Sequence, residues 1–392
     1  MSKASLKPGW RAVKLGDVVN YVRDRVRREE TGLEYYLGGE HFDKASIHVN
    51  GRGIIASNPI GPAFHMRFKS GQTLLVSRNP HLRKASIAEF EGICADTTYV
   101  CEAVPQILLP ELLPFLMQTD AFWEHAERNK RGSTNPYLNW SDFASFEFAL
   151  PPMQEQRCIA ELLWAADEAV EKCAALAARI TQYSEKVIES SLTSGHFDSV
   201  LGDYCARDGI RIGPFGSLLH AEEYRPHGVP VVMPADVQDG VINEEAIAHV
   251  SEEKAEELKN YRLCENDILF SRRGDLTKRA LVQRHQTGWL CGTGTIRVRL
   301  RDGVNARAAY LAVTSDSVNR WLTRFSVGTT MPNLNAATIS RIPLHLPDPD
   351  TAVALVNEIY RVLSLAQAVK EHQQSISRVL RALAEAATME EM

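Results

Sequence analysis

The stretch that comes nearest to a catalytic motif is Asn135-Pro136-Tyr137. Enzymes that methylate DNA bases carry Asn-Pro-Pro-(Tyr/Phe) at the end of a strand, and a Gly-rich loop that leads from a strand into a helix holds their cofactor. Here the second proline is missing, and the nearest Gly-rich candidate, residues 292–294, is followed by a strand-like run. The sequence therefore predicts no catalytic residue and no cofactor.

Two basic turns carry the residue types that contact DNA. Arg pairs with guanine and Asn with adenine, whereas Lys, Ser and Thr bind phosphate. In the first half of the chain the predicted contacts are Arg78, Asn79, Arg83, Lys84, Lys130, Arg131, Ser133, Thr134, Asn135 and Tyr137. In the second half they are Arg272, Arg273, Lys278, Arg279, Arg284, Thr329, Thr330 and Asn333. The alternative for both turns is a merely solvated basic surface.

The bulk composition is that of a folded protein. Of the 392 residues 44% are hydrophobic and 24% charged, which excludes a disordered chain, and the net charge of −5 excludes a basic nucleic-acid coat. The seven cysteines contain no Cys-x-x-Cys pair, so no metal site is predicted. We find no apolar run of membrane-spanning length and no signal-peptide core, so we expect a cytoplasmic protein.

The two halves of the chain contain the same short sequence motifs in the same order. Leu-Gly-Asp occurs twice, Ser77-Arg78 aligns with Ser271-Arg272, and Leu-Pro closes each half. The matched segments are 15–17 with 201–203, 71–79 with 266–274, 93–100 with 290–298, 132–139 with 328–335, and 150–151 with 346–347. Offsets that stay between 186 and 197 residues predict two copies of one domain.

Each predicted domain is followed by a long helix. Short strand-like runs and Gly/Pro turns predict mixed α/β (α+β) domains at residues 1–150 and 199–347. Apolar residues at heptad spacing predict long helices within 151–198 and 348–392. We expect the two helices to form an antiparallel coiled coil with pseudo-twofold symmetry. The alternative is that each helix only covers its own domain.

One junction resembles a known family. Residues 150–172, LPPMQEQRCIAELLWAADEAVEK, resemble the start of the long helix in specificity subunits of type I restriction–modification enzymes. The start of the chain, residues 9–19, is similar to the entry of a target-recognition domain in that family. The positions that match at the junction are Leu150, Pro151, Pro152, Met153, Glu155, Gln156, Ile159 and Asp167.

The resemblance implies a non-catalytic subunit that recognises double-stranded DNA. Each domain would read one half of a bipartite site, and the helices would set the unread spacer. Two methyltransferase subunits would dock on the helices and motor–nuclease subunits would join them, with no membrane involved. We expect docking residues at Glu155, Gln156, Arg157 and Asp167. The second junction departs from the pattern, because Thr351, Ala352 and Leu363 stand where the first has Glu155, Gln156 and Asp167.

Two other functions remain open at this point. One is a structural adaptor whose paired domains bind proteins, and the other is a methyltransferase in its own right.

Overall fold

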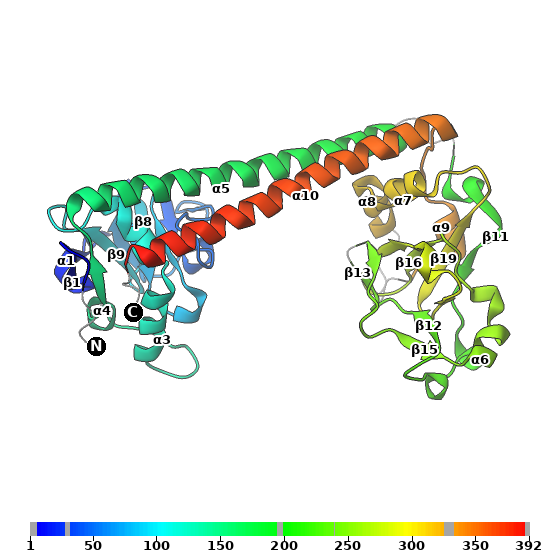
Figure 1. The fold of residues 1–392 in the computed structure, drawn as a ribbon, viewed down its shortest axis with the longest axis horizontal. Coiled ribbons are helices and arrows are strands. Elements are labelled where there is room, and N and C mark those ends of the chain that lie inside the picture. Colours follow the sequence, from blue (N-terminus) through cyan, green and yellow to red (C-terminus); the bar gives the residue numbers. More distant parts are fainter. Residues whose placement is uncertain (1–5, 28–31, 194–198, 239, 325–332, 389–392) are drawn as a thin grey trace. The chain divides into compact units, whose positions relative to one another are not determined.

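The computed structural model describes residues 6–27, 32–193, 199–238, 240–324 and 333–388. The chain divides into two compact units. Unit 1 comprises Met1–Ala174 together with Lys370–Met392, and unit 2 comprises Ala175–Val369. Each unit therefore contains one domain and parts of both long helices (Figure 1).

Domain 1 is built on two four-stranded sheets. The first has the order β2 (Val19–Val22), β9 (Thr98–Ala103), β6 (Thr73–Val76), β7 (Ala85–Ile87). The second has the order β4 (Gly53–Ile54), β3 (Tyr35–Leu37), β8 (Gly92–Ala95), β5 (Phe64–Phe68), and β1 (Arg11–Lys14) pairs with β10 (Glu147–Leu150). The helices are α1 (Leu15–Val18), α2 (Leu113–Leu116), α3 (Asp120–Asn129) and α4 (Trp140–Ala144).

Domain 2 repeats this plan. Its first sheet has the order β11 (Cys205–Ile212), β19 (Thr295–Leu300), β16 (Ile268–Ser271), β17 (Arg279–Leu281). Its second has the order β15 (Ala248–Val250), β12 (Val229–Val232), β18 (Leu290–Cys291), and β13 (Val237–Gln238) pairs with β14 (Val241–Ile242). The helices are α6 (Glu252–Glu257), α7 (Ala306–Thr314), α8 (Asp316–Arg324) and α9 (Ala336–Ser340).

One inner strand of each first sheet, β6 in domain 1 and β16 in domain 2, is buried on both faces. Successive side chains of a strand point to opposite faces. In β6, Leu75 joins the core beneath the helices, whereas Leu74 joins the core shared with the second sheet. In β16, Phe270 and Leu269 divide in the same way. An unbroken apolar run, rather than an alternating one, follows from burial on both faces.

The prediction of two copies of one domain is confirmed by the matching strand order of the two first sheets, and the second sheets match except that β5 of domain 1 has no paired counterpart among the described strands of domain 2. The register also corrects one alignment. Val76 lies opposite Thr98, and Ser271 lies opposite Thr295. Val76 therefore corresponds to Ser271, so the structural counterpart of Arg78 is Arg273. The letter match of Ser77-Arg78 with Ser271-Arg272 is wrong by one residue, because the two identical dipeptides start at different points of their strands.

The long helices α5 (Met153–Ile188) and α10 (Pro349–Ala386) pack together in opposite directions. In unit 1 the start of α5, at Ala160 and Leu163, shares a core with Ala384 near the end of α10. In unit 2 the end of α5, at Ile188, packs against a core that includes Ile359 near the start of α10. The expected antiparallel pairing is thus confirmed, and the alternative of helices that cover only their own domains is wrong.

Among the described residues, α10 is long and apolar enough to cross a membrane by length and composition alone. Part of this apolar character is used in packing. Ala352, Val356 and Ile359 are buried in unit 2, and Ala384 is buried in unit 1.

The start of α5 is fastened to domain 1 by three polar side chains. The buried amide of Gln156 accepts from the backbone N–H of Leu109 at 2.8 Å and donates to two domain 1 carbonyls. Glu155 accepts a hydrogen bond from the Trp10 indole at 3.0 Å. Asp167 lies 2.7 Å from Nε2 of His48, whose other ring nitrogen lies 3.1 Å from Glu89. The hydrogen bond with Asp167 raises the pKa of His48 to about 9, against the opposing effect of burial.

The far end of each long helix is held by a carboxylate. In unit 2, Glu189 accepts from the backbone N–H of Ser317 at the first turn of α8, at 2.7 Å. In unit 1, Glu385 accepts from the backbone N–H of Asp120 at the first turn of α3. Both carboxylates satisfy amide donors that a helix start leaves without a partner inside the helix. The two glutamates lie 196 residues apart, so the same contact is made in both units.

We expect Glu189→Ala to destabilise unit 2 by about 1–2 kcal/mol, the usual cost of losing a helix cap. The measurement is urea unfolding followed by circular dichroism, with Glu185→Ala, an exposed residue one turn earlier on α5, as control. Equal midpoints for the two variants would contradict the capping role.

We expect the stabilisation from His48 to depend on pH. The folded pKa of about 9 lies above the ordinary 6.5, so the contribution is complete below pH 6.5 and is lost as the pH rises through about 9. His48→Gln should therefore lower the urea midpoint clearly at pH 6 and hardly at all at pH 10. Asp167→Leu, which copies Leu363 of the second helix, should show the same trend. A difference from wild type that does not change with pH would refute this account.

Candidate nucleic-acid interface

In domain 1 the basic turn between β6 and β7 is joined to the loop that ends at Tyr137. Leu138 donates its backbone N–H to the carbonyl of Ser77 at 3.0 Å, and Asn79 donates to Pro136 at 2.7 Å. Tyr137 exchanges two backbone hydrogen bonds with Arg131, both of 2.9 Å. These bonds make the turn and the loop one surface, which brings together two of the segments that the sequence singled out.

Only some of the predicted contacts on this surface are free to bind a ligand. Arg78 is exposed and forms no ion pair with any described residue, and Tyr137 is 42% exposed. The small polar side chains Ser133, Thr134 and Asn135 are exposed as well. Asn79 is half-buried in a left-handed conformation, as expected for a turn residue.

The other basic residues are engaged within the chain. Arg83 pairs with Asp120, and Lys84 donates to the carbonyl of Gly39 at 2.5 Å. Lys130 pairs with Glu127 at 2.6 Å, and Arg131 pairs with Asp142 at 2.9 Å. The Arg131 guanidinium lowers the pKa of the Asp142 carboxyl, as expected for a bound ion pair. These four side chains therefore stabilise the surface through contacts within the chain, and a ligand would have to compete with those contacts.

Sequence reasoning missed two arginines beside this surface. A hollow of about 710 Å³ is lined by Arg78 and Tyr137 together with Arg23 and Arg25, which follow β2. Its other lining residues are Tyr21, Ser77, Asp96, Thr97, Tyr99, Leu138, Asn139, Trp140 and Ser141. The basic run YVRDRVRR at residues 21–28 was a usable signal, but only the structure shows that Arg23 and Arg25 line the same hollow as Arg78.

Domain 2 presents the corresponding surface at Arg273. Arg273 forms a β-bridge with Asn333, just as Arg78 does with Tyr137. Arg272 holds the two segments together, since its carbonyl accepts from Leu334 and its Nε donates to the Leu334 carbonyl, both at 3.0 Å. Arg273 and Arg284 are exposed and Lys278 is half-buried. Thr329 and Thr330 lie outside the described residues.

Arg279 is a correction to the predicted contacts. It belongs to β17, is only 2% exposed, and donates to Asn319 at 2.8 Å. Its guanidinium lies over the ring of Phe270, and burial lowers its pKa to about 10. The position corresponds to the buried Ala85 of domain 1, so Arg279 supports the sheet and cannot reach a groove of DNA in this structure.

The four predicted docking residues differ in their exposure and in the contacts they make within the chain. Gln156 and Asp167 are buried and bonded to domain 1, and Glu155 binds Trp10, so these side chains fasten α5 to its own domain. Arg157 is the one of the four that is exposed without a described partner. At the second junction Ala352 is buried in the place of Gln156, so a small apolar residue replaces the amide.

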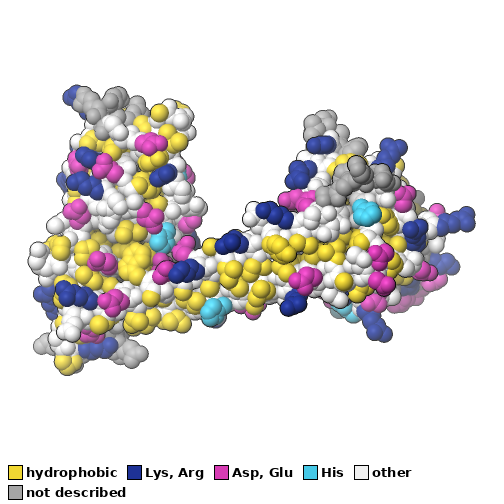
Figure 2. Space-filling view, turned by 90° about the horizontal axis from the view of Figure 1, so that it is seen from above, with side chains coloured by type: hydrophobic (Ala, Val, Ile, Leu, Met, Phe, Trp, Pro, Cys, Tyr) yellow, Lys and Arg dark blue, Asp and Glu magenta, His cyan; other side chains and the backbone are white. Residues whose placement is uncertain are grey.

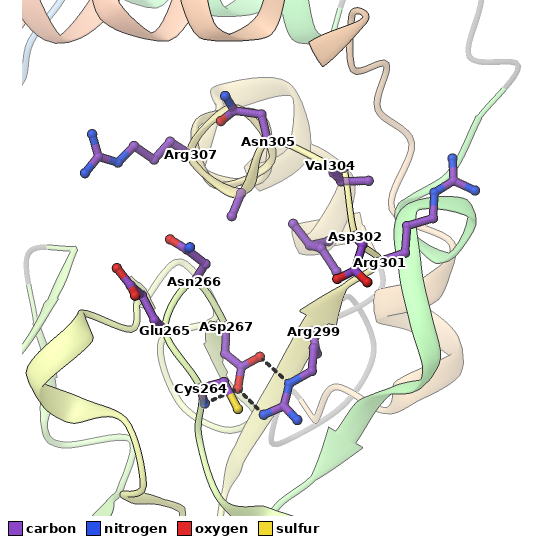
Figure 3. Close-up of a pocket in the computed structure, with 13 residues that line it drawn as sticks. Cys264, Glu265, Asn266, Asp267, Arg299, Arg301, Asp302, Val304, Asn305 and Arg307 are labelled. Carbon is purple, nitrogen blue, oxygen red and sulfur yellow. Dashed lines mark hydrogen bonds and ion pairs between the residues drawn. The ribbon is translucent and has the colours of Figure 1, made fainter.

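A further pocket in domain 2 lies at the opposite end of β16 and β19 from the basic turn (Figure 3). Arg299 points toward Asp267 and pairs with it at 2.7 Å. Two more arginines in the lining, Arg301 and Arg307, are matched by Glu265 and Asp302. Because the charges balance, this pocket shows no preference for an anion, and the basic turns remain the candidate site.

Comparison with known proteins identifies the family of the chain. The family described as type I restriction modification DNA specificity domain matches residues 7–182 and again residues 216–390. The type I restriction enzyme EcoDI specificity subunit of Escherichia coli is 25% identical over 158 residues, or 38% of this chain. The match spans only 35% of that relative's length.

Two solved structures share the fold along nearly the whole chain. One is described as the structural basis of complex assembly and conformational transition of the type I R-M system; it has a TM-score of 0.63, 19% identity and 98% coverage of each chain. The other is the type I restriction-modification S subunit from M. genitalium, with a TM-score of 0.52, 15% identity, and coverage of 100% of this chain and 99% of that one. Since the family match covers both halves, the chain belongs to the type I restriction modification DNA specificity family.

Proposed function

We propose that this chain is the DNA specificity subunit of a type I restriction–modification complex in which each domain reads one half of a bipartite site. The observation that carries the proposal is the pair of equivalent turns with unlike side chains. An exposed arginine occupies the same place in both, at Arg78 and Arg273, but its bridge partner is Tyr137 in one domain and Asn333 in the other. The same backbone arrangement of turn and loop, which we call the frame, thus carries different exposed side chains, which we call the readers. Such an arrangement suits two half-sites of different sequence.

The frame and the readers have separate roles in this proposal. Backbone bonds between turn and loop hold the frame, and the exposed side chains supply contacts to base edges or phosphates. An exposed Arg can bind guanine through two hydrogen bonds, and an Asn can do the same with adenine. The chain itself carries no catalysis, so chemistry on the DNA falls to its partners.

Two methyltransferase subunits dock on the long helices in this proposal, and motor–nuclease subunits join the complex in the cytoplasm. Figure 2 shows hydrophobic side chains gathered along these helices. The large exposed ones are Leu162, Leu176, Tyr183, Val353, Tyr360, Leu365, Val379 and Leu383. Apolar side chains that recur on the solvent face of a helix are a common mark of a protein interface. With a net charge of −5, the subunit needs partners to neutralise DNA phosphates.

We expect the complex of this chain with its methyltransferase to select a bipartite motif from a pool of randomised DNA duplexes. The half-sites should lie on one face of the duplex, about 34 Å apart. Arg273→Ala should relax base preference in one half only, at a cost of about 1–3 kcal/mol at the position it contacts. The control is Arg207→Ala, an exposed arginine in β11 near the other end of the sheet.

Three outcomes would contradict the proposal. A single continuous motif would exclude two readers, and S-adenosylmethionine binding by the isolated chain would favour a methyltransferase. Capture of proteins with no selection of DNA would favour an adaptor.

We expect the long helices to set the length of the unread spacer. Deleting one heptad from each helix, residues 170–176 and 370–376, removes about 10 Å of helix at 1.5 Å per residue. The selected motif should then lose about three base pairs of spacer, because one turn of about 34 Å holds about 10 base pairs. Both deletions keep the heptad register, so a folded variant with an unchanged spacer would exclude a ruler role.

A further inference from the structure

The ends of the two equivalent sheets differ in chemistry where they approach the basic turns. In domain 1, Val22 lies opposite Val100, and in domain 2, Arg211 lies opposite Arg297. Since β9 and β19 correspond at an offset of 197 residues, Arg23 corresponds to Ile212 and Arg25 to Pro214. Two cationic residues of domain 1 are therefore replaced by two apolar residues in domain 2.

The cationic end in domain 1 is held firmly in place. After β2 the chain continues along β5: Val26 donates to His65 at 2.9 Å, and Arg25 forms a bridge with Met66. Both Arg23 and Arg25 are exposed, and the Arg23 guanidinium lies 4.8 Å from the centre of the Tyr21 ring. Together with Arg78 they line a hollow whose one acidic residue is Asp96.

The apolar end in domain 2 is held as firmly. Gly213 donates to Thr295 at 2.9 Å, and the Thr293 hydroxyl donates to the Pro214 carbonyl at 2.7 Å. A Cβ at position 213 would lie 1.9 Å from the Gly292 carbonyl oxygen, so the two backbones touch. The next side chain, Phe215, is 62% exposed, and Leu218 is 46% exposed.

The segment that carries this apolar pair is joined, through residues 293–294, to the basic turn of domain 2. Thr293, which holds Pro214, is followed by Gly294, whose carbonyl accepts from the backbone N–H of Arg272 at 2.8 Å. Phe215 therefore follows a residue that is hydrogen-bonded to the segment behind the basic turn, and most of its side chain is exposed to water. Burial of such a ring against a partner is favourable, and DNA offers two apolar surfaces, the thymine methyl group and the faces of unstacked bases.

We infer that the two domains grip DNA in different ways: Arg23 and Arg25 bind phosphates beside the first half-site, whereas Phe215 and Leu218 contact bases of the second. The inference rests on the proposed function, since it assigns further residues to the same interface. It predicts that the contribution of Arg23 and Arg25 depends strongly on salt and that of Phe215 and Leu218 does not, because phosphate contacts release counterions and apolar contacts do not.

The test measures the affinity of the complex of this chain with its methyltransferase for a duplex carrying the selected motif, at several salt concentrations. Arg23→Gln with Arg25→Gln should reduce the slope of log K against log [salt] by about 2, since each lost phosphate contact removes about 0.9. Phe215→Ala should weaken binding about tenfold at every salt concentration, leave the slope unchanged, and relax base preference in the second half-site. Phe215→Leu should retain most of the affinity.

Two matched controls separate local contact from general loss. Arg207→Gln with Arg301→Gln removes the same charge from exposed positions at the other end of the first sheet of domain 2. Val241→Ala removes an apolar side chain that is 58% exposed on the β13–β14 hairpin, outside that sheet. Neither should change the slope or the affinity by more than about twofold.

The inference fails if wild type binds its motif specifically while the Arg23/Arg25 variant keeps the full slope, or if Phe215→Ala binds as wild type does. If wild type shows no preference for any sequence, the proposed function itself fails, and the inference fails with it.

Discussion

Two carboxylates, Glu189 and Glu385, fix where the long helices meet the domains, and the rest of the structure depends on these contacts. Each accepts a backbone N–H at the start of a short helix, α8 in unit 2 and α3 in unit 1. A second bond accompanies each: His345 donates to Leu192, and Ala149 donates to Thr388, both at 3.1 Å. Every partner recurs after 196 or 197 residues, so each helix ends on its unit through the same pair of contacts.

In each first sheet the basic turn joins two neighbouring strands, β6 to β7 in domain 1 and β16 to β17 in domain 2. The basic side chains in and beside these turns have one of two roles, packing inside the sheet or exposure at the turn, and the residue type alone does not distinguish them. Arg279 and Arg273 are both arginines in one basic run, yet one is a buried part of β17 and the other an exposed end of the turn. Strand pairing decides between them, because Arg279 takes the place of Ala85 in the sheet.

The sequence predicted the larger architecture because its signals are local and repeated. A heptad pattern of apolar residues identifies a long helix without any knowledge of its partner. Short sequence motifs that recur in the same order identify a second copy of a domain. The contacts that Gln156 and Asp167 make within the chain could not be predicted from the junction, because the residues they contact lie far away in the sequence at Leu109 and His48. Arg23 and Arg25 were missed for the same reason. Only the strand order β2-β9-β6 brings them next to Arg78.

In the proposed function, the two domains of one chain read two separate half-sites. The most direct test is to map adenine methylation across the host genome with the chain present, with it deleted, and with domain 2 replaced by a second copy of domain 1. We expect a bipartite methylated motif that disappears on deletion and becomes symmetric after the replacement. Methylation that persists without the chain, or a motif that keeps both original halves after the replacement, would contradict it.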